Sequence, residues 1–188
     1  MNDLKYYAEA FTHLHTATIK GHKAPHKAVL LLAVIDMVET KAISSPKIEL
    51  TDELVRKFHH IWMRYVGEST IFRPKIETPY LHMQYESFWR LVEKTNTNAS
   101  IAAEGMPWYK GMVQKKELPQ GSYSLKALRS AFEYAKIDNK LFEVLQNADA
   151  RALLRVLLIN TYLTNQPTFT MPDLGKLILA LSAVLLAA

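Results

Sequence analysis

The feature that most constrains this chain is a cation-rich turn that runs directly into an unbroken apolar segment. Residues 20–27 read Lys-Gly-His-Lys-Ala-Pro-His-Lys, without an acidic side chain, and residues 28–35 are all apolar. Pro25 suits the first position of a helix, because its missing N–H costs nothing there and its fixed φ is helical. A helix that is apolar on nearly every side is typical of a buried central element. We therefore predict a buried helix over 25–40 whose N-terminal end is surrounded by cations.

The start of this helix has the properties of an anion-binding site. A helix N-terminus offers free N–H groups and the positive end of the helix dipole. Lys23 and Lys27 add positive charge, as do His22 and His26 when they are protonated. These four residues predict a site for a phosphate-like anion. A solvated turn in front of a core helix is the alternative interpretation.

Hydrophobic periodicity predicts helices on both sides of the central one. Apolar residues recur at helical spacing over 3–19, and Gly21 is expected to close that helix. Thr51 is a good N-cap for a third helix. Ser124 is an equally good N-cap for the first of three later helices, which we expect over 125–135.

Two short segments have the pattern of strands. They are residues 47–50, which alternate, and residues 87–92, which also fit a short helix but favour a strand. The stretch 67–121 contains four prolines and little helical periodicity. The predicted fold class is therefore mainly α: a compact helical domain with a few short strands and an irregular middle segment. The order helix, short strand, helix resembles a winged-helix core.

Length and composition limit the domain organisation. The 188 residues suit one domain with a small appendage, which we expect over 1–165 and 166–188. The apolar helical appendage is expected to pack on the body or to mediate self-association. Its apolar run, 177–188, is too short to span a bilayer, so no membrane partner is expected. The lack of cysteine and of a signal-peptide pattern fits a cytoplasmic protein.

The charge distribution favours a polyanionic partner. The chain carries a formal net charge of +5. In the middle segment cations alternate with aromatic residues, which is what a nucleic-acid surface needs to hold phosphates and to contact bases. The cations that we expect at such a surface are Arg73, Lys75 and Lys110. The alternative is that the aromatic residues are core and that the cations are simply solvated.

The sequence lacks the common signatures of catalysis and metal binding. His22 and His26 are four residues apart, but Pro25 places the start of the helix between them. The adjacent His59 and His60 would point in different directions on a helix. The HExxH, Gly-x-Ser-x-Gly, P-loop and dinucleotide-binding motifs are absent from the sequence. We therefore predict no catalytic residue, no metal site and no cofactor in this chain.

Four segments resemble one known family. They are GHKAPHK (21–27) before the leucine run, TPYLH (78–82), FWRL (88–91) and RALLRVLLINTY (151–162). Together they look like the sulfur-binding domain of phosphorothioate-dependent, McrA-like type IV restriction endonucleases, which also carry an HNH nuclease domain. The similarity covers roughly residues 10–165.

The resemblance implies a helical domain that docks on duplex DNA. The domain recognises a backbone in which sulfur replaces one non-bridging phosphate oxygen, and the sulfur occupies a shallow apolar cavity made partly by a proline ring. By this resemblance the cavity proline would be Pro79, with Tyr80 and His82 beside it. Thr78 stands where the family is expected to have an aromatic residue, so the cavity wall is expected to differ.

The resemblance also implies which cations hold the backbone. His22 and Lys23 would contact the modified linkage or its neighbours, and Lys110 would be the cation of a later loop. Lys23 stands where arginine is expected to be common, and lysine cannot make the same bidentate contact.

The predicted function is the recognition of phosphorothioated duplex DNA, as the targeting domain of a modification-dependent restriction system. The family's nuclease lies further along the chain, and no His-Asn-His candidate occurs here, so the chain is not expected to be an enzyme by itself. Two alternatives remain open. One is a winged-helix-like transcription regulator that reads ordinary DNA, and the other is a helical protein-interaction domain.

Overall fold

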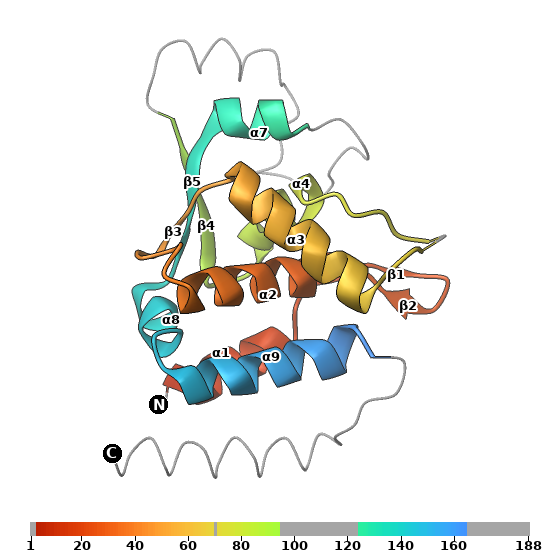
Figure 1. Cartoon of the computed structure of the whole chain (residues 1–188), viewed down its shortest axis with the longest axis horizontal. Coiled ribbons are helices and arrows are strands. Elements are labelled where there is room, and N and C mark those ends of the chain that lie inside the picture. The colour runs from red at the N-terminus through yellow and green to blue at the C-terminus, as the bar shows by residue number, and fades with distance from the viewer. Residues whose placement is uncertain (1–2, 70, 95–123, 165–188) are drawn as a thin grey trace.

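The computed structural model describes residues 3–69, 71–94 and 124–164. Helix α2 (His26–Glu39) lies at the centre, as Figure 1 shows. Helix α3 (Asp52–Tyr65) packs on one side of it, and α9 (Ala148–Tyr162) packs on another side together with α1 (Asp3–Thr12). The remaining elements are β1 (Thr18–Ile19), β2 (His22–Lys23), β3 (Lys47–Ile48), α4 (Glu77–His82), η1 (Met83–Tyr85), β4 (Trp89–Glu93), α7 (Leu125–Ala131), β5 (Phe132–Ile137) and α8 (Asn139–Val144).

The described part of the chain is a mainly α domain with a few short antiparallel strands, which confirms the predicted fold class. The predicted central helix is also confirmed, because α2 is buried along almost its whole length. It begins one residue later than predicted, since Pro25 is its N-cap. Thr51 and Ser124 cap α3 and α7 as predicted, each accepting a hydrogen bond from the backbone N–H three residues later.

The segment after α1 differs from the prediction. The first helix ends at Thr12 rather than near residue 19, and residues 18–23 form the β1–β2 hairpin. Lys20 and Gly21 form its two-residue turn with φ values of 51° and 79°. Positive φ at both central positions is what a hairpin turn matched to the strand twist requires. Gly21 therefore serves a hairpin turn and not a helix end.

A three-stranded antiparallel sheet has the order β3–β5–β4. The prediction of a helix over 125–135 was wrong in its second half, because α7 ends at Ala131 and β5 begins at Phe132. In the sheet, Ala135 and Ile137 face the core and Lys136 faces solvent. Strand β4 confirms the preferred strand over 87–92, and β3 confirms the strand at 47–50 in shorter form.

A buried ion pair joins α2 to the segment that precedes β4. The Lys27 Nζ lies 2.5 Å from the Glu86 Oε1, and the two side chains are only 7% and 5% exposed. The Glu86 carboxylate also accepts a hydrogen bond from the backbone N–H of His15, at 3.0 Å. Burial lowers the pKa of Lys27, and the interaction with Glu86 opposes that effect. One carboxylate thus holds together α2, the chain leading to the hairpin and the chain leading into β4.

Several predictions fall on residues outside the described ranges. Lys110, most of the irregular middle segment and the 166–188 appendage belong there. The division at residue 165 and the self-association through the appendage therefore stay predictions. Among the described helices, none combines the length and the apolar character that crossing a membrane requires.

Lys27→Met should lower the free energy of unfolding by about 3–5 kcal/mol, because it leaves the Glu86 carboxylate buried without its cation. The double variant Lys27→Met/Glu86→Leu should recover most of that loss, since no buried charge remains. Urea unfolding followed by circular dichroism measures both. As a control, Asp52→Asn breaks the exposed contact with Arg129 and should change stability little. A double variant no more stable than Lys27→Met would contradict this account.

Candidate nucleic-acid interface

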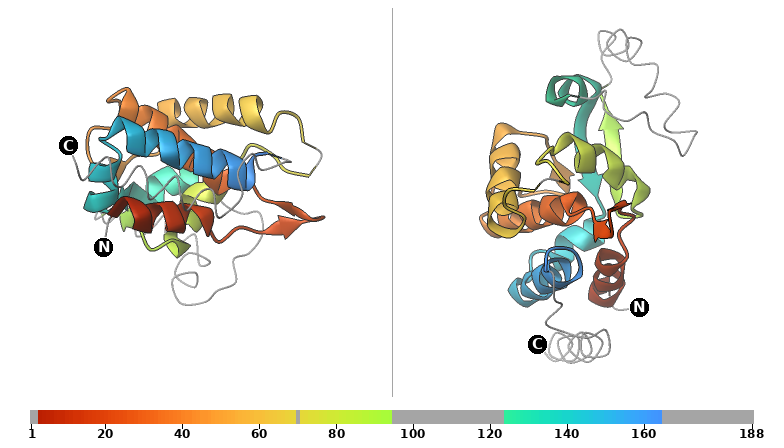
Figure 2. Two further views of the ribbon diagram at one scale, coloured as in Figure 1. Left: turned by 90° about the horizontal axis from the view of Figure 1, so that it is seen from below. Right: turned by 90° about the vertical axis from the view of Figure 1, so that its right-hand side faces the viewer.

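The β1–β2 hairpin is an exposed basic element that adjoins the start of α2. All four of its strand residues are exposed, and it projects from the body at the N-terminal end of α2 (Figures 1 and 2). Lys20, His22 and Lys23 are exposed on it. The backbone N–H of Ala24 donates to the Ala17 carbonyl at 2.8 Å, which closes the base of the hairpin. The hairpin therefore presents positive charge to solvent.

A surface cavity of about 250 Å³ lies at the base of the hairpin, and we call it the hairpin cavity. The Lys23 Nζ lies 5.4 Å from the centroid of the Tyr162 ring, one of the groups that line it. Glu68 and Ser69 contribute polar edges. Its apolar and aromatic lining comes from Pro25, Tyr65, Val66, Ile71, Phe72, Tyr162 and Leu163.

His26 is a positioning residue rather than a surface cation. Its ring is half-buried between Trp62 and Phe72, with ring centroids 4.8 and 5.7 Å away. Burial lowers the pKa of His26, so the ring is neutral at pH 7. Its Nε2 lies 2.8 Å from the Arg73 carbonyl oxygen, and a neutral ring donates that hydrogen bond. The expectation that a protonated His26 adds charge to the helix start is therefore wrong at neutral pH, and the ring instead fixes the backbone at Arg73.

Lys27 is likewise not available to a phosphate. Its ammonium group is buried and paired with Glu86, so it faces the core and not solvent. The sequence placed Lys27 among the anion-binding cations because it belongs to the cation-rich turn at the start of the helix. In the structure the helix turns this position inward, and the charge is used within the protein.

The segment of α4 that resembles the family's cavity is packed against the core. Pro79 and Tyr80 are buried, and the Tyr80 hydroxyl donates to the Ile48 carbonyl at 2.7 Å. Burial raises the pKa of Tyr80 above its ordinary range. The two rings lie on the face of α4 that packs inward, which differs from the open cavity that the resemblance implies. The assignment of Pro79, Tyr80 and His82 to a sulfur pocket stays a prediction.

The two segments singled out in the sequence adjoin one another. Helices α2 and α4 pack together, and Lys27 and His26 of α2 are near enough to His82 of α4 to affect its pKa. Burial is the largest cause that lowers the pKa of His82, to about 4, and these two side chains lower it further. His82 is therefore neutral at pH 7, half-exposed, and 6.1 Å from Tyr85 between ring centroids.

Arg73 and Lys75 are exposed on the connection between α3 and α4. The hydrogen bond from His26 holds Arg73 beside the start of α2, and the neighbouring Phe72 lines the hairpin cavity. Of the basic residues predicted for the site, His22, Lys23, Arg73 and Lys75 are therefore exposed. Lys27 is buried, and His26 is half-buried. Of the exposed basic side chains, His22 and Lys23 line the hairpin cavity, and Arg73 follows the lining residue Phe72 in the sequence.

Sequence reasoning missed two of the rings that line the hairpin cavity, those of Tyr65 and Tyr162. Tyr65 ends α3 and Tyr162 ends α9, and nothing local in the sequence sets either apart from a core tyrosine. Tyr162 occurs in one of the resembling segments, but its contact with Lys23 joins distant parts of the chain. Within the described ranges, no three side chains of His, Asp or Glu converge as a metal site would require.

No family model matches this chain, and no curated protein matches it.

Stability should depend on pH through His82. Its folded pKa of about 4 lies below the unfolded value near 6.5, so the folded state favours the neutral ring. The contribution of His82 is full above pH 6.5 and is lost as the pH falls from about 6.5 toward 4. His82→Gln should therefore flatten the fall in melting temperature over that window. An NMR titration of the His82 ring should show a midpoint near 4, and a midpoint above 6 would refute the assignment.

Proposed function

We propose that this chain is a DNA-binding module that recognises phosphorothioate-modified duplex DNA and targets a modification-dependent restriction system in the cytoplasm. The observation that carries the proposal is the hairpin cavity, which sets aromatic and proline rings beside exposed cations. Of the segments that resemble the sulfur-binding family, the first supplies His22, Lys23 and Pro25 to this cavity, and it leads into α2, which packs against α4. Catalysis is not assigned to these residues.

Exposed cations give such a module its general affinity. Lys20, Lys23, Arg73 and Lys75 lie in a region that can follow a phosphate backbone, and neutralised phosphates release counterions. Their contacts would fix the protein's position on the duplex without reading sequence. Affinity of this kind falls steeply as salt increases.

Rings beside the cations suit sulfur better than oxygen. Sulfur is larger and more weakly hydrated, so contact with an apolar surface gains free energy. A phosphate oxygen would lose its water there without a compensating hydrogen bond. By analogy with a single methylene in a pocket, this difference is worth about 1–3 kcal/mol. The preference is therefore expected to be moderate and to act on top of the general affinity.

One pair of oligonucleotide duplexes tests the proposal. The same sequence is made with and without a single phosphorothioate, and a band-shift titration measures both dissociation constants. The modified duplex should bind about 10–100-fold more tightly. Equal binding of both duplexes would remove the sulfur proposal and would favour a reader of ordinary DNA.

Two variants then locate the sulfur contact. Tyr65→Ala removes a ring from the hairpin cavity, and Pro79→Ala removes the ring that the resemblance implicates. One variant should lose the preference for the modified duplex while it keeps the wild-type circular dichroism spectrum and melting temperature. The ring removed in that variant is the one that contacts the sulfur. A preference that survives both changes would contradict both assignments.

Lys23→Ala should weaken binding to modified and unmodified duplexes by the same factor, because this side chain holds phosphates and not sulfur. The slope of log affinity against log salt should also fall by about one. Lys126→Ala is the matched control, since Lys126 is an exposed lysine on α7, outside the hairpin region. Equal effects of the two substitutions would show that only the net charge matters.

A further inference from the structure

Three cations stand in one row across the sheet. Lys136 of the central strand β5 is the register partner of Lys47 in β3 and of Arg90 in β4. Register partners project from the same face of a sheet, and all three side chains are exposed. Neighbouring strands lie about 4.8 Å apart, so the row spans about 10 Å. We call these three residues the cation row.

Such a row is unfavourable unless something offsets it. Like charges directly opposite one another in a sheet destabilise the pairing. In the described part of the chain none of the three forms an ion pair. Lys47 has an aromatic contact instead, because its Nζ lies 4.7 Å from the centroid of the Tyr134 ring. The fold therefore keeps three cations together without an acidic partner from the described residues.

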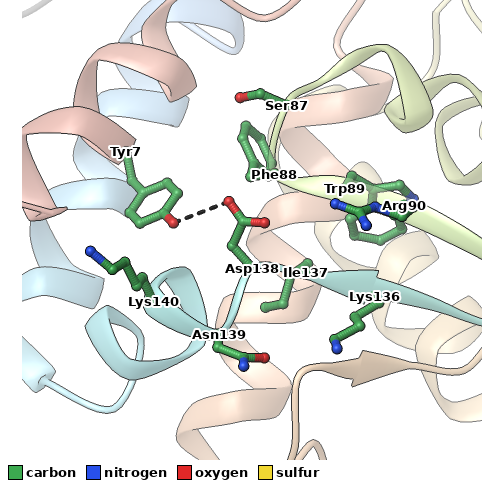
Figure 3. A pocket seen from close by; sticks show the side chains of 10 residues that line it. All are labelled: Tyr7, Ser87, Phe88, Trp89, Arg90, Lys136, Ile137, Asp138, Asn139 and Lys140. Atoms are coloured by element: carbon green, nitrogen blue, oxygen red, sulfur yellow. Dashed lines mark hydrogen bonds between the residues drawn. The ribbon is translucent and has the colours of Figure 1, made fainter.

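The row borders a second cavity, of about 320 Å³, shown in Figure 3. Arg90 and Lys136 line it from β4 and β5, and Lys140 lines it from the start of α8. Ser87 and Asn139 add neutral polar groups. The volume is within the range of pockets that hold small molecules. Arg90 and Lys136 thus line one concave site without an ion pair among the described residues, whereas Lys140 at its edge is paired with Asp3 at 3.4 Å.

The cavity also contains one carboxylate that is not used as a helix cap. Asp138 occupies the N-cap position of α8, but its side chain makes no capping hydrogen bond. It accepts instead from the Tyr7 hydroxyl at 3.2 Å, as the dashed line in Figure 3 marks. A carboxylate held in this way can accept hydrogen bonds from the hydroxyl groups of a ligand.

We infer that this cavity binds a phosphorylated sugar, such as that of a mononucleotide, with its phosphates on Arg90 and Lys136 of the cation row and a hydroxyl on Asp138. The carboxylate argues against a duplex backbone as the ligand, because a uniform polyanion would be repelled by Asp138. A small ligand can place its phosphates and its hydroxyls on different groups. The cavity is separate from the hairpin region, since the sheet and the hairpin lie toward opposite ends of α2 (Figure 1). The inference does not rest on the proposed DNA recognition.

Isothermal titration calorimetry of the full chain with ATP, inorganic triphosphate and adenosine tests it. ATP and triphosphate should bind, and adenosine should not. Lys136→Glu should weaken ATP binding at least tenfold, whereas Lys126→Glu, with the same charge change on α7, should leave it unchanged. Asp138→Asn should weaken the binding of ATP but not of triphosphate.

Thermal stability supplies an independent readout. Lys136→Glu should raise the melting temperature while it weakens ATP binding, because a carboxylate between two cations turns repulsion into attraction. A lower melting temperature would show that the row is not under repulsion, and it would overturn the inference. Failure of the wild type to bind ATP at millimolar concentration would overturn it as well. A third outcome would also overturn it: the wild type does not bind ATP, and Lys136→Glu loses binding to duplex DNA. The cation row would then contact the DNA backbone.

Discussion

The buried pair between Lys27 and Glu86 is the interaction on which the rest of this structure depends. It fixes the first turn of the central helix against the chain entering β4, and the same carboxylate anchors the backbone at His15 just before the hairpin. A buried charge of this kind is costly unless its partner is in place, so the three segments can be buried together only in this arrangement. The position of the hairpin, and with it the exposed cations, follows from a contact in the core.

Among the described residues near the start of α2, the buried ionisable side chains are paired or neutral, and the unpaired charges are on the surface. Lys27 is paired within the core, and burial keeps His26 and His82 neutral at pH 7. The charges left on the surface belong to the hairpin and to the connection after α3, where Lys23 and Arg73 are exposed. The neutral ring of His26 connects the buried and the exposed groups, since it hydrogen-bonds the backbone carbonyl of the exposed Arg73.

The sequence predicted well wherever a single segment carries the signal. The all-apolar run after Pro25 could only be a buried helix, and the N-caps Thr51 and Ser124 act through their own neighbours. Prediction from the sequence failed where residues far apart in the chain determine the structure. Strand β5 exists because β3 and β4 pair with it from far earlier in the chain, and Lys27 is buried because Glu86 meets it there. The hairpin cavity needed α3, α9 and the hairpin together, which no local pattern reveals.

The strand order β3–β5–β4 also governs how the chain can fold. The two outer strands do not pair with each other, so the sheet cannot form until residues 132–137 are available. The buried face of α1 is likewise covered only when α9, near the other end of the described residues, packs against it. Contacts of such long sequence separation slow folding, because the loop must close before the contact is gained. During synthesis the early helices and strands therefore emerge with uncovered apolar surface, and completion of the core is delayed until the last third of the chain has left the ribosome.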